Sequence, residues 1–88
     1  MELQSNRELY EYLVGLGKIL AAHNALDLSA LVLAASRHVV AFPTTEFLGE
    51  ARIALREVQT QERFLNGSER AQLLDVLSQL DRAFKKRT

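Results

Sequence analysis

The stretch of sequence that decides the fold is LSALVLAASRHVVAF, residues 28–42, which is apolar at almost every position. Only Ser29, Ser36, Arg37 and His38 interrupt it. A helix that is apolar on nearly all sides needs cover on more than one face. In a chain of 88 residues only a few neighbours can provide that cover. The sequence therefore predicts that this segment is either the centre of a small helical bundle or half of a contact with another chain.

Length and composition restrict the class of protein further. A chain of 88 residues forms one domain, residues 1–88, and buries roughly 60–65% of the surface that its unfolded form exposes. Hydrophobic residues make up 48% and charged residues 25%, which is typical of a folded globular protein. Eleven basic side chains balance eleven acidic ones, so no overall field attracts nucleic acid or an anionic membrane. The absence of cysteine excludes disulfides and thiolate zinc sites.

The N-terminal residues and the apolar runs indicate a soluble protein. Residues 1–4 lack the basic and apolar regions of a secretion signal. The longest strictly apolar run, residues 30–35, is far too short to span a bilayer. We therefore expect a cytoplasmic protein with no membrane contact.

Capping residues predict where the first two helices begin. Ser5 and Glu8 have the spacing of a capping box, in which each side chain accepts a hydrogen bond from a free backbone donor. The first helix should therefore cover about residues 6–23. Asp27 can cap the second helix, which should cover about residues 28–41.

Proline and glycine predict the remaining boundaries. Pro43 ends the second helix, and the two threonines that follow it offer caps for a third helix over about residues 45–64. Asn66 and the glycine after it form the most turn-like dipeptide in the chain. Either Asn66 or Ser68 can cap a fourth helix over about residues 68–86.

The spacing of these helices predicts an all-α protein with an up-down topology. The connectors are short, which makes consecutive helices antiparallel neighbours, and no segment alternates with the period of a strand. Two antiparallel hairpins then form a small four-helix bundle. A helical solenoid of two repeats is the alternative, but no residue pattern recurs between the two halves and such stacks usually need three units.

The predicted third helix has one core-facing stripe and two charged flanks. Its stripe consists of Phe47, Leu48, Ala51, Ala54, Leu55 and Val58. One flank carries the arginine row Arg52, Arg56 and Arg63. The other flank carries Glu46, Glu50 and Glu57. Ile53 lies between the flanks, opposite the core, where it is either a single exposed apolar residue or the anchor of a partner-binding ridge.

The first two helices have more apolar surface than one neighbour can cover. On the first helix, Tyr12 and Ile19 lie on the flank of a leucine seam. On the second helix, the predicted core seam consists of Leu28, Leu31, Val32, Ala35, Val39 and Phe42. Leu33 and Val40 form a second seam on the far side, beside Ser29, Ser36 and Arg37. We expect this second seam to be covered by the fourth helix or by the same seam of a second copy in a symmetric dimer.

No catalytic, cofactor or metal motif stands out, so we expect no enzymatic activity. The two histidines, His23 and His38, fall at helix C-termini, about 16 Å apart along an antiparallel hairpin, and cannot share a metal ion. Glu46 and Glu50 share a face, but no Glu-x-x-His motif accompanies them. The consecutive residues Ser36, Arg37 and His38 point about 100° apart on a helix, so they cannot converge. These residues therefore predict neither a cofactor nor a metal site.

Nucleic-acid binding is the main alternative function. The arginine row spans ~16 Å of helix, which is enough to contact several phosphates. The glutamates on the opposite flank and the acidic start of the same helix argue against it.

The sequence as a whole favours a small non-enzymatic protein-interaction module that is a homodimer or a subunit of an assembly. Its partners would be other proteins or itself, bound through helix faces. The candidate partner-binding residues are Leu33, Val40, Arg37, Tyr12, Ile19, Ile53, Arg52 and Arg56.

Overall fold

A computed structural model describes residues 6–37 and 44–85 of the chain. Within these residues the secondary structure consists of helices joined by short turns and contains no strand. The α-helices are α1 (Asn6–Ala22), α2 (Leu26–Ser36), α4 (Thr44–Thr60) and α5 (Gly67–Lys85), with a short 3-10 helix, η1 (Glu62–Phe64), between the last two. The prediction of a small all-α bundle is confirmed.

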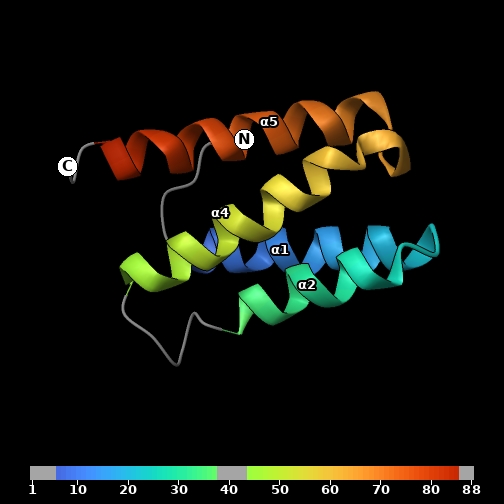
Figure 1. The fold of residues 1–88 in the computed structure, drawn as a ribbon, viewed down its shortest axis with the longest axis horizontal. Helices are drawn as coiled ribbons and strands as arrows, with labels where there is room; N and C mark the ends of the chain where they lie inside the picture. The colour runs from blue at the N-terminus through green and yellow to red at the C-terminus, as the bar shows by residue number, and fades with distance from the viewer. Residues whose placement is uncertain (1–5, 38–43, 86–88) are drawn as a thin grey trace.

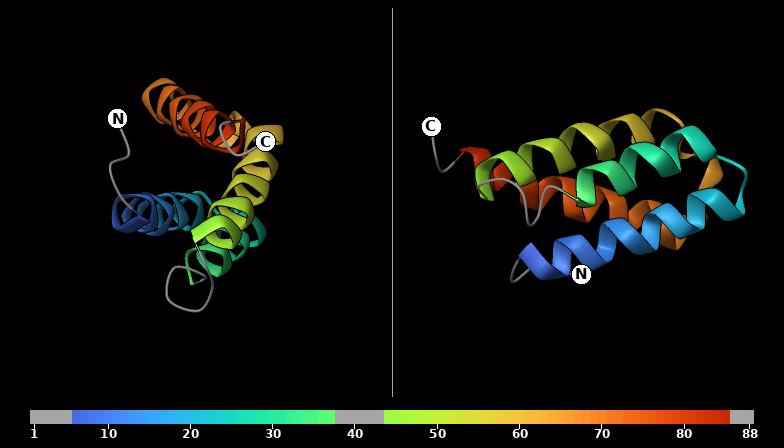
Figure 2. Two further views of the ribbon diagram at one scale, coloured as in Figure 1. Left: turned by 90° about the vertical axis from the view of Figure 1, so that its left-hand side faces the viewer. Right: turned by 90° about the horizontal axis from the view of Figure 1, so that it is seen from below.

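The helices follow an up-down-up-down path (Figure 1). Both α1 and α4 run in one direction, and both α2 and α5 return in the other. Among the described residues, the extensive helix contacts join consecutive helices: α1 with α2, α2 with α4, and α4 with α5. The end-on view shows α4 along one side of the molecule, with α1 and α5 reaching away from it (Figure 2). The contact between α1 and α5 is sparser than the other three.

The first helix ends in a turn that sets the start of the second. Asn24 has a positive φ of 62°. Its N–H donates to Ala21 O at 3.0 Å, and the N–H of Ala25 reaches back to Leu20 O at 2.8 Å. This is the Schellman arrangement, with asparagine in the left-handed position that glycine usually occupies. It lets α2 begin at Leu26, so Asp27 lies in the first turn of α2. The prediction that Asp27 is the N-cap of this helix is therefore wrong.

The helix α2 ends at Ser36, before the predicted end at about residue 41, and α4 and α5 each begin one residue before the predicted start. Asn66 Oδ1 accepts from Glu69 N at 2.8 Å, and Glu69 Oε1 accepts from Asn66 N at 2.9 Å. This reciprocal capping box confirms Asn66 as the cap of α5. The helix α4 ends at Thr60, one turn before the predicted end, because η1 then tightens the chain and brings Leu65 into the core. Ser5, the predicted cap of α1, and the segment 38–43 lie outside the described residues, whereas Thr44 and Thr45, the predicted caps of the third helix, are the first two residues of α4.

All four helices contribute to one core. Its fully buried large side chains are Phe47, Leu9, Leu13, Leu20, Leu55, Leu73, Val32, Val58 and Val76. The stripe predicted on α4 is largely confirmed: Phe47, Ala51, Ala54, Leu55 and Val58 are buried and Leu48 is half-buried.

The predicted core seam of α2 is confirmed at Leu28, Val32 and Ala35, which are buried, and is wrong at Leu31. Leu31 was expected in the core and is 37% exposed, whereas Ser29 and Ser36 were expected outside and are buried. The burial of Ser29 follows from the packing of α2 against α1, because Gly17 has no side chain and lets the two helices approach closely. Ser29 Oγ donates to Gly17 O at 2.7 Å, so the buried hydroxyl is satisfied across the helix contact. Ser36 Oγ donates to Leu33 O, within its own helix.

Candidate interaction surfaces

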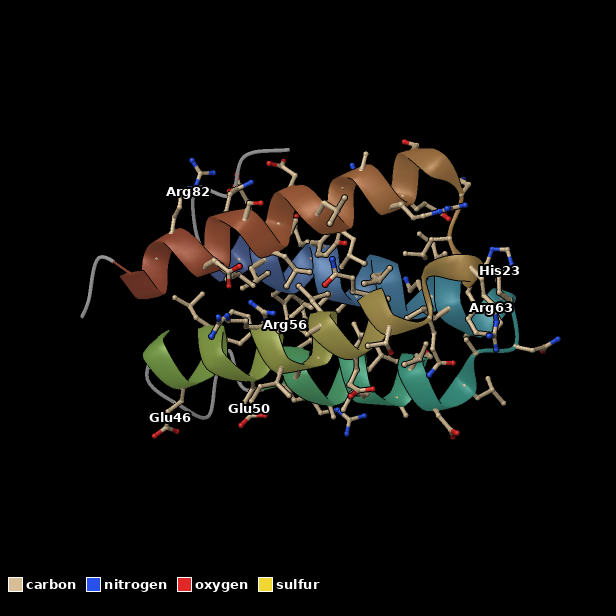
Figure 3. The ribbon with its side chains drawn as sticks, turned by 45° about the horizontal axis from the view of Figure 1, so that its top comes forward. His23, Glu46, Glu50, Arg56, Arg63 and Arg82 are labelled. Carbon is tan, nitrogen blue, oxygen red and sulfur yellow. The ribbon has the colours of Figure 1, made fainter. Side chains whose placement is uncertain are left out.

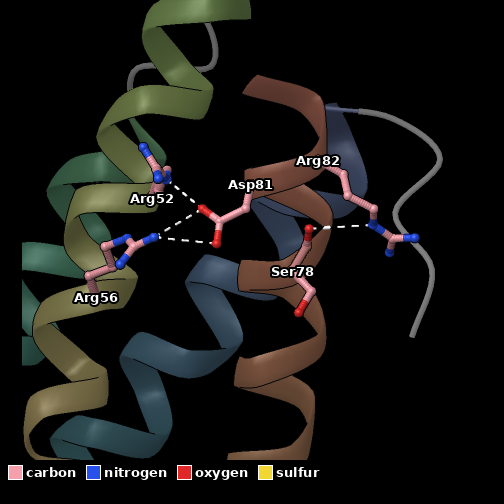
Figure 4. A network of polar contacts seen from close by, with 5 residues as sticks. All are labelled: Arg52, Arg56, Ser78, Asp81 and Arg82. Carbon is pink, nitrogen blue, oxygen red and sulfur yellow. Dashed lines mark hydrogen bonds and ion pairs between the residues drawn. The ribbon is translucent and has the colours of Figure 1, made fainter. Parts of the chain in front are cut away.

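The arginine row of α4 makes contacts within the chain. Arg52 Nε donates to Asp81 Oδ1 at 2.6 Å, and Arg56 Nη2 approaches the two oxygens of the same carboxylate at 3.1 and 3.3 Å (Figure 4). Asp81 belongs to α5, so this cluster joins the second hairpin. The hydrogen bond from Arg52 is the main cause that lowers the pKa of Asp81, and Arg56 adds to it. The guanidinium groups of Arg52 and Arg56 are therefore both paired with the carboxylate of Asp81.

The third member of the row lies apart from the other two. The guanidinium of Arg63 lies 5.0 Å from the centre of the Phe64 ring, in η1. Figure 3 shows it at the same end of the bundle as His23, away from Arg56. The three arginines therefore do not form one continuous cationic strip, although all three remain at least partly exposed.

The acidic flank of α4 lies on the outside of the bundle. Glu46 and Glu50 are exposed and point away from the other helices (Figure 3). Ile53 is 59% exposed, as its position opposite the core predicts. Among the residues that the structure describes, no group of three histidine, aspartate or glutamate side chains is placed to hold a metal ion.

Leu33, the described member of the expected second seam of α2, lies against α1. Leu33 is half-buried, and a Cβ added to Gly17 would lie 2.7 Å from Leu33 Cδ2. Part of Leu33 is therefore covered by α1, and our expectation that α5 or a second copy covers this seam stays a prediction. Val40, the other member of the seam, lies outside the described residues.

A different face of α2 is open, and we call it the outer face of α2. It consists of Leu26, Asp27, Ala30, Leu31, Ala34 and Arg37, all of them exposed. Leu26 is 63% exposed and Leu31 is 37% exposed. The spacing of these six positions places them along one side of a helix. Only Arg37 among them had been a candidate contact residue, because the sequence pattern did not show which side of so apolar a helix faces outward.

Tyr12 and Ile19 lie in a groove between α1 and α5, which we call the α1–α5 groove. It is lined by Glu11, Tyr12, Gly15, Leu16, Ile19, Glu69 and Gln72. Tyr12 is only 9% exposed, and its hydroxyl has no hydrogen-bond partner among the described residues. Burial, and then the negative charge of Glu69, raise the pKa of Tyr12. The structure thus brings together two predicted contact residues and places them beside residues of α5.

Asp81 and Glu69 were not identified from the sequence. A signal for Asp81 exists in hindsight, because Arg52 and Arg56 are four residues apart and a pair with that spacing can share one carboxylate on a neighbouring helix. Glu69 follows Asn66 with capping spacing, but its position near Tyr12 depends on the packing of α5 against α1.

Comparison with protein-family models, with curated proteins and with solved structures gives no match for this chain. In the described part of the chain, none of the helices has the length and apolar character required to cross a bilayer. The surfaces described above are therefore the basis for a functional proposal.

Proposed function

We propose that this protein is a non-enzymatic protein-interaction module that pairs with a second copy of itself through the outer face of α2. The observation that carries the proposal is the exposure of Leu26 and Leu31 on one side of a helix, which also carries the exposed residues Ala30 and Ala34. Covering an exposed apolar helix face with another surface is favourable, because it removes apolar side chains from water.

The arrangement of small and charged residues favours a second copy as the occupant. If two α2 helices pack antiparallel about a two-fold axis, Ala30 of one copy lies at the height of Ala34 of the other. The small side chains allow the helix axes to approach closely. In the same register, Asp27 of one copy lies at the height of Arg37 of the other, and the long arginine side chain can cross to it. The face is thus self-complementary in shape and charge, as a two-fold interface requires.

The size of the face predicts a weak dimer. The helix α2 has 11 residues and is therefore ~16 Å long. A contact limited to such a helix belongs to the small, transient class of interfaces, so the dimer should dissociate on dilution. The arginine row does not enter this proposal, because Arg52 and Arg56 already bind Asp81.

Sedimentation equilibrium from about 10 μM to about 1 mM tests the proposal. The wild-type chain should pass from monomer to dimer over this range, and Leu31→Glu should remain monomeric because it buries a charge at the contact. Leu74→Glu is the matched control, since Leu74 is 49% exposed on α5, away from this face. It should dimerise as the wild type does.

A charge exchange tests the antiparallel register. Asp27→Arg and Arg37→Asp should each weaken the dimer, and the double variant should recover most of the loss because the opposite pairs are restored. Circular dichroism checks that each variant remains helical. A wild-type chain that is monomeric at 1 mM would overturn the proposal.

A further inference from the structure

Two exposed apolar side chains, Ile53 on α4 and Leu74 on α5, lie outside the outer face of α2. Ile53 is 59% exposed and Leu74 is 49% exposed. Single exposed apolar residues are ordinary on a protein surface. What distinguishes these two is the sign of the charge around each of them.

Ile53 is surrounded by negative charge. Glu50 precedes it by three residues and Glu57 follows it by four, so the three side chains share one face of α4. Both glutamates are exposed, and Figure 3 shows Glu50 on the outer side of the helix. Within residues 6–37 and 44–85, no basic side chain forms an ion pair with either carboxylate. We call Glu50, Ile53 and Glu57 the acidic patch.

Leu74 has the opposite surroundings. Arg70 precedes it by four residues and Asp81 follows it by seven, so these residues lie along one face of α5. Arg70 is exposed, and its Nε donates to Leu65 O at 3.1 Å, which fixes the stem of the side chain. At the other end, two arginines of α4 share the carboxylate of Asp81, so this cluster keeps a net positive charge (Figure 4). The cationic patch consists of Arg52, Arg56, Arg70 and Leu74.

The two patches match in sign and in layout. Each has one apolar side chain with charges before and after it along the helix: at ~5 and ~6 Å in the acidic patch, and at ~6 and ~10 Å in the cationic patch. Figure 3 shows Glu50 and Arg56 on different sides of α4, so one molecule cannot join its own two patches. A second copy can supply the complementary patch.

We propose that the acidic patch of one copy docks on the cationic patch of the next, with Ile53 against Leu74 and the glutamates towards the arginines. Apolar contact removes the two exposed side chains from water, and the charges select the partner and its orientation. The contact joins two different surfaces, so it does not close on itself and generates an open linear assembly. It uses no residue of the outer face of α2.

The dependence on salt separates this contact from the proposed dimer. The screening length is about 30 Å at 0.01 M salt and about 8 Å at 0.15 M. Attraction between exposed charges is therefore effective only at the lower concentration. We expect linear assembly at about 0.01 M salt and association at least about tenfold weaker at about 0.15 M.

Sedimentation equilibrium in the Leu31→Glu background tests the proposal, because the outer face of α2 no longer pairs in this background. At about 0.01 M salt the protein should form species larger than a dimer as its concentration approaches 1 mM, and at about 0.15 M it should be monomeric. Ile53→Lys and Leu74→Glu each place the wrong charge at the centre of one patch. Each should abolish the assembly at low salt.

Mixing the two variants is the decisive experiment. The Ile53→Lys protein keeps its cationic patch and the Leu74→Glu protein keeps its acidic patch, so an equimolar mixture at low salt should form a 1:1 pair and nothing larger. Lys18→Gln is the matched control: it changes the net charge as Leu74→Glu does, at an exposed position of α1 outside both patches, and should assemble normally. Circular dichroism checks that each variant remains helical.

Two variants that stay monomeric when mixed would overturn the proposal and would leave a foreign acidic segment as the occupant of the cationic patch. Association that is equally strong at both salt concentrations would also overturn it. A wild-type protein that forms a dimer at 0.15 M salt and nothing larger at 0.01 M would contradict the linear assembly alone. Linear assembly in a protein that is monomeric at 0.15 M would contradict the proposed dimer alone.

Discussion

The two hairpins of this protein are held together by different physical means. In the first, α1 and α2 approach closely because Gly17 has no side chain, Leu33 fills the notch, and Ser29 bonds directly to the backbone of α1. In the second, the polar link between α4 and α5 is made by long side chains that meet at Asp81. Shape complementarity dominates the first contact, and charge adds to apolar packing in the second. The two hairpins should therefore respond differently to substitutions, acid and salt.

The largest expected effect is at the notch of the first hairpin. Gly17→Val places atoms where Leu33 already lies, and we expect the free energy of unfolding to fall by roughly 2–3 kcal/mol. Gly15→Val is the matched control, because nothing lies within 4 Å of an added Cβ there. It should change stability by no more than about 0.5 kcal/mol. Urea unfolding measures both.

A second substitution tests whether overpacking causes the loss, since valine is a better helix former than glycine. Leu33→Ala in the Gly17→Val background should recover part of the lost stability, because it vacates the notch. If the double variant loses more free energy of unfolding than the two single variants lose together, steric conflict at Gly17 is the wrong explanation.

A smaller effect is expected where the same hairpin uses a hydrogen bond. Ser29→Ala removes the bond to Gly17 O across the helix contact and should lower the free energy of unfolding by about 1 kcal/mol. Ser36→Ala is the control, because Ser36 is also buried but bonds only within α2. Its loss should be smaller, since alanine is the better helix former. Equal losses in thermal or urea unfolding would mean that the hydrogen bond between the helices contributes no more stability than the bond within α2.

The smallest effect is expected at the second hairpin, and it should depend on pH. Asp81→Asn should lower the free energy of unfolding by roughly 0.5–1 kcal/mol near neutral pH, because the three side chains are 37–52% exposed and water screens their charges. The pKa of Asp81 is lowered in the folded protein, so its stabilisation is present above the unfolded value of about 3.9. It is lost as the pH falls below that value.

Acid titration of stability checks the sign of this effect. The difference between wild type and Asp81→Asn should shrink as the pH falls from 6 to 2, and it should also shrink in about 1 M salt. Glu57→Gln, which changes an exposed carboxylate on α4, should show a smaller difference. If the difference in free energy of unfolding between wild type and Asp81→Asn does not change with acid, the contribution of Asp81 is not ionic.

Local patterns in the sequence predicted the helical class and most boundaries. The stripe on α4 was recognisable because its apolar residues recur with helical spacing and polar residues occupy the other side. The cap of α5 was recognisable because Asn66 and Glu69 act over three residues. The end of α4 was placed one turn late, because a 3-10 turn forms to bury Leu65 and depends on the core beneath it.

The candidate sites were less predictable than the helices. Tyr12 and Ile19 were identified from the width of the apolar arc on α1, but their neighbour was not, because arc width does not say which helix lies opposite. The exposure of Ile53 followed from its position alone. The partner of Arg52 and Arg56 lies on another helix, 29 and 25 positions away along the chain, so no local pattern specified it.

The sequence by itself determined that this chain forms α-helices, where most of them begin and end, and which side of α4 is buried, because these properties depend on neighbours within one or two turns. Only the tertiary structure decided which side of α2 faces outward. A helix that is apolar all round has no preferred side of its own, so its orientation depends on the shape of its neighbour. Here the absence of a side chain at Gly17 draws Ser29 and Leu33 inward and leaves Leu31 exposed to solvent.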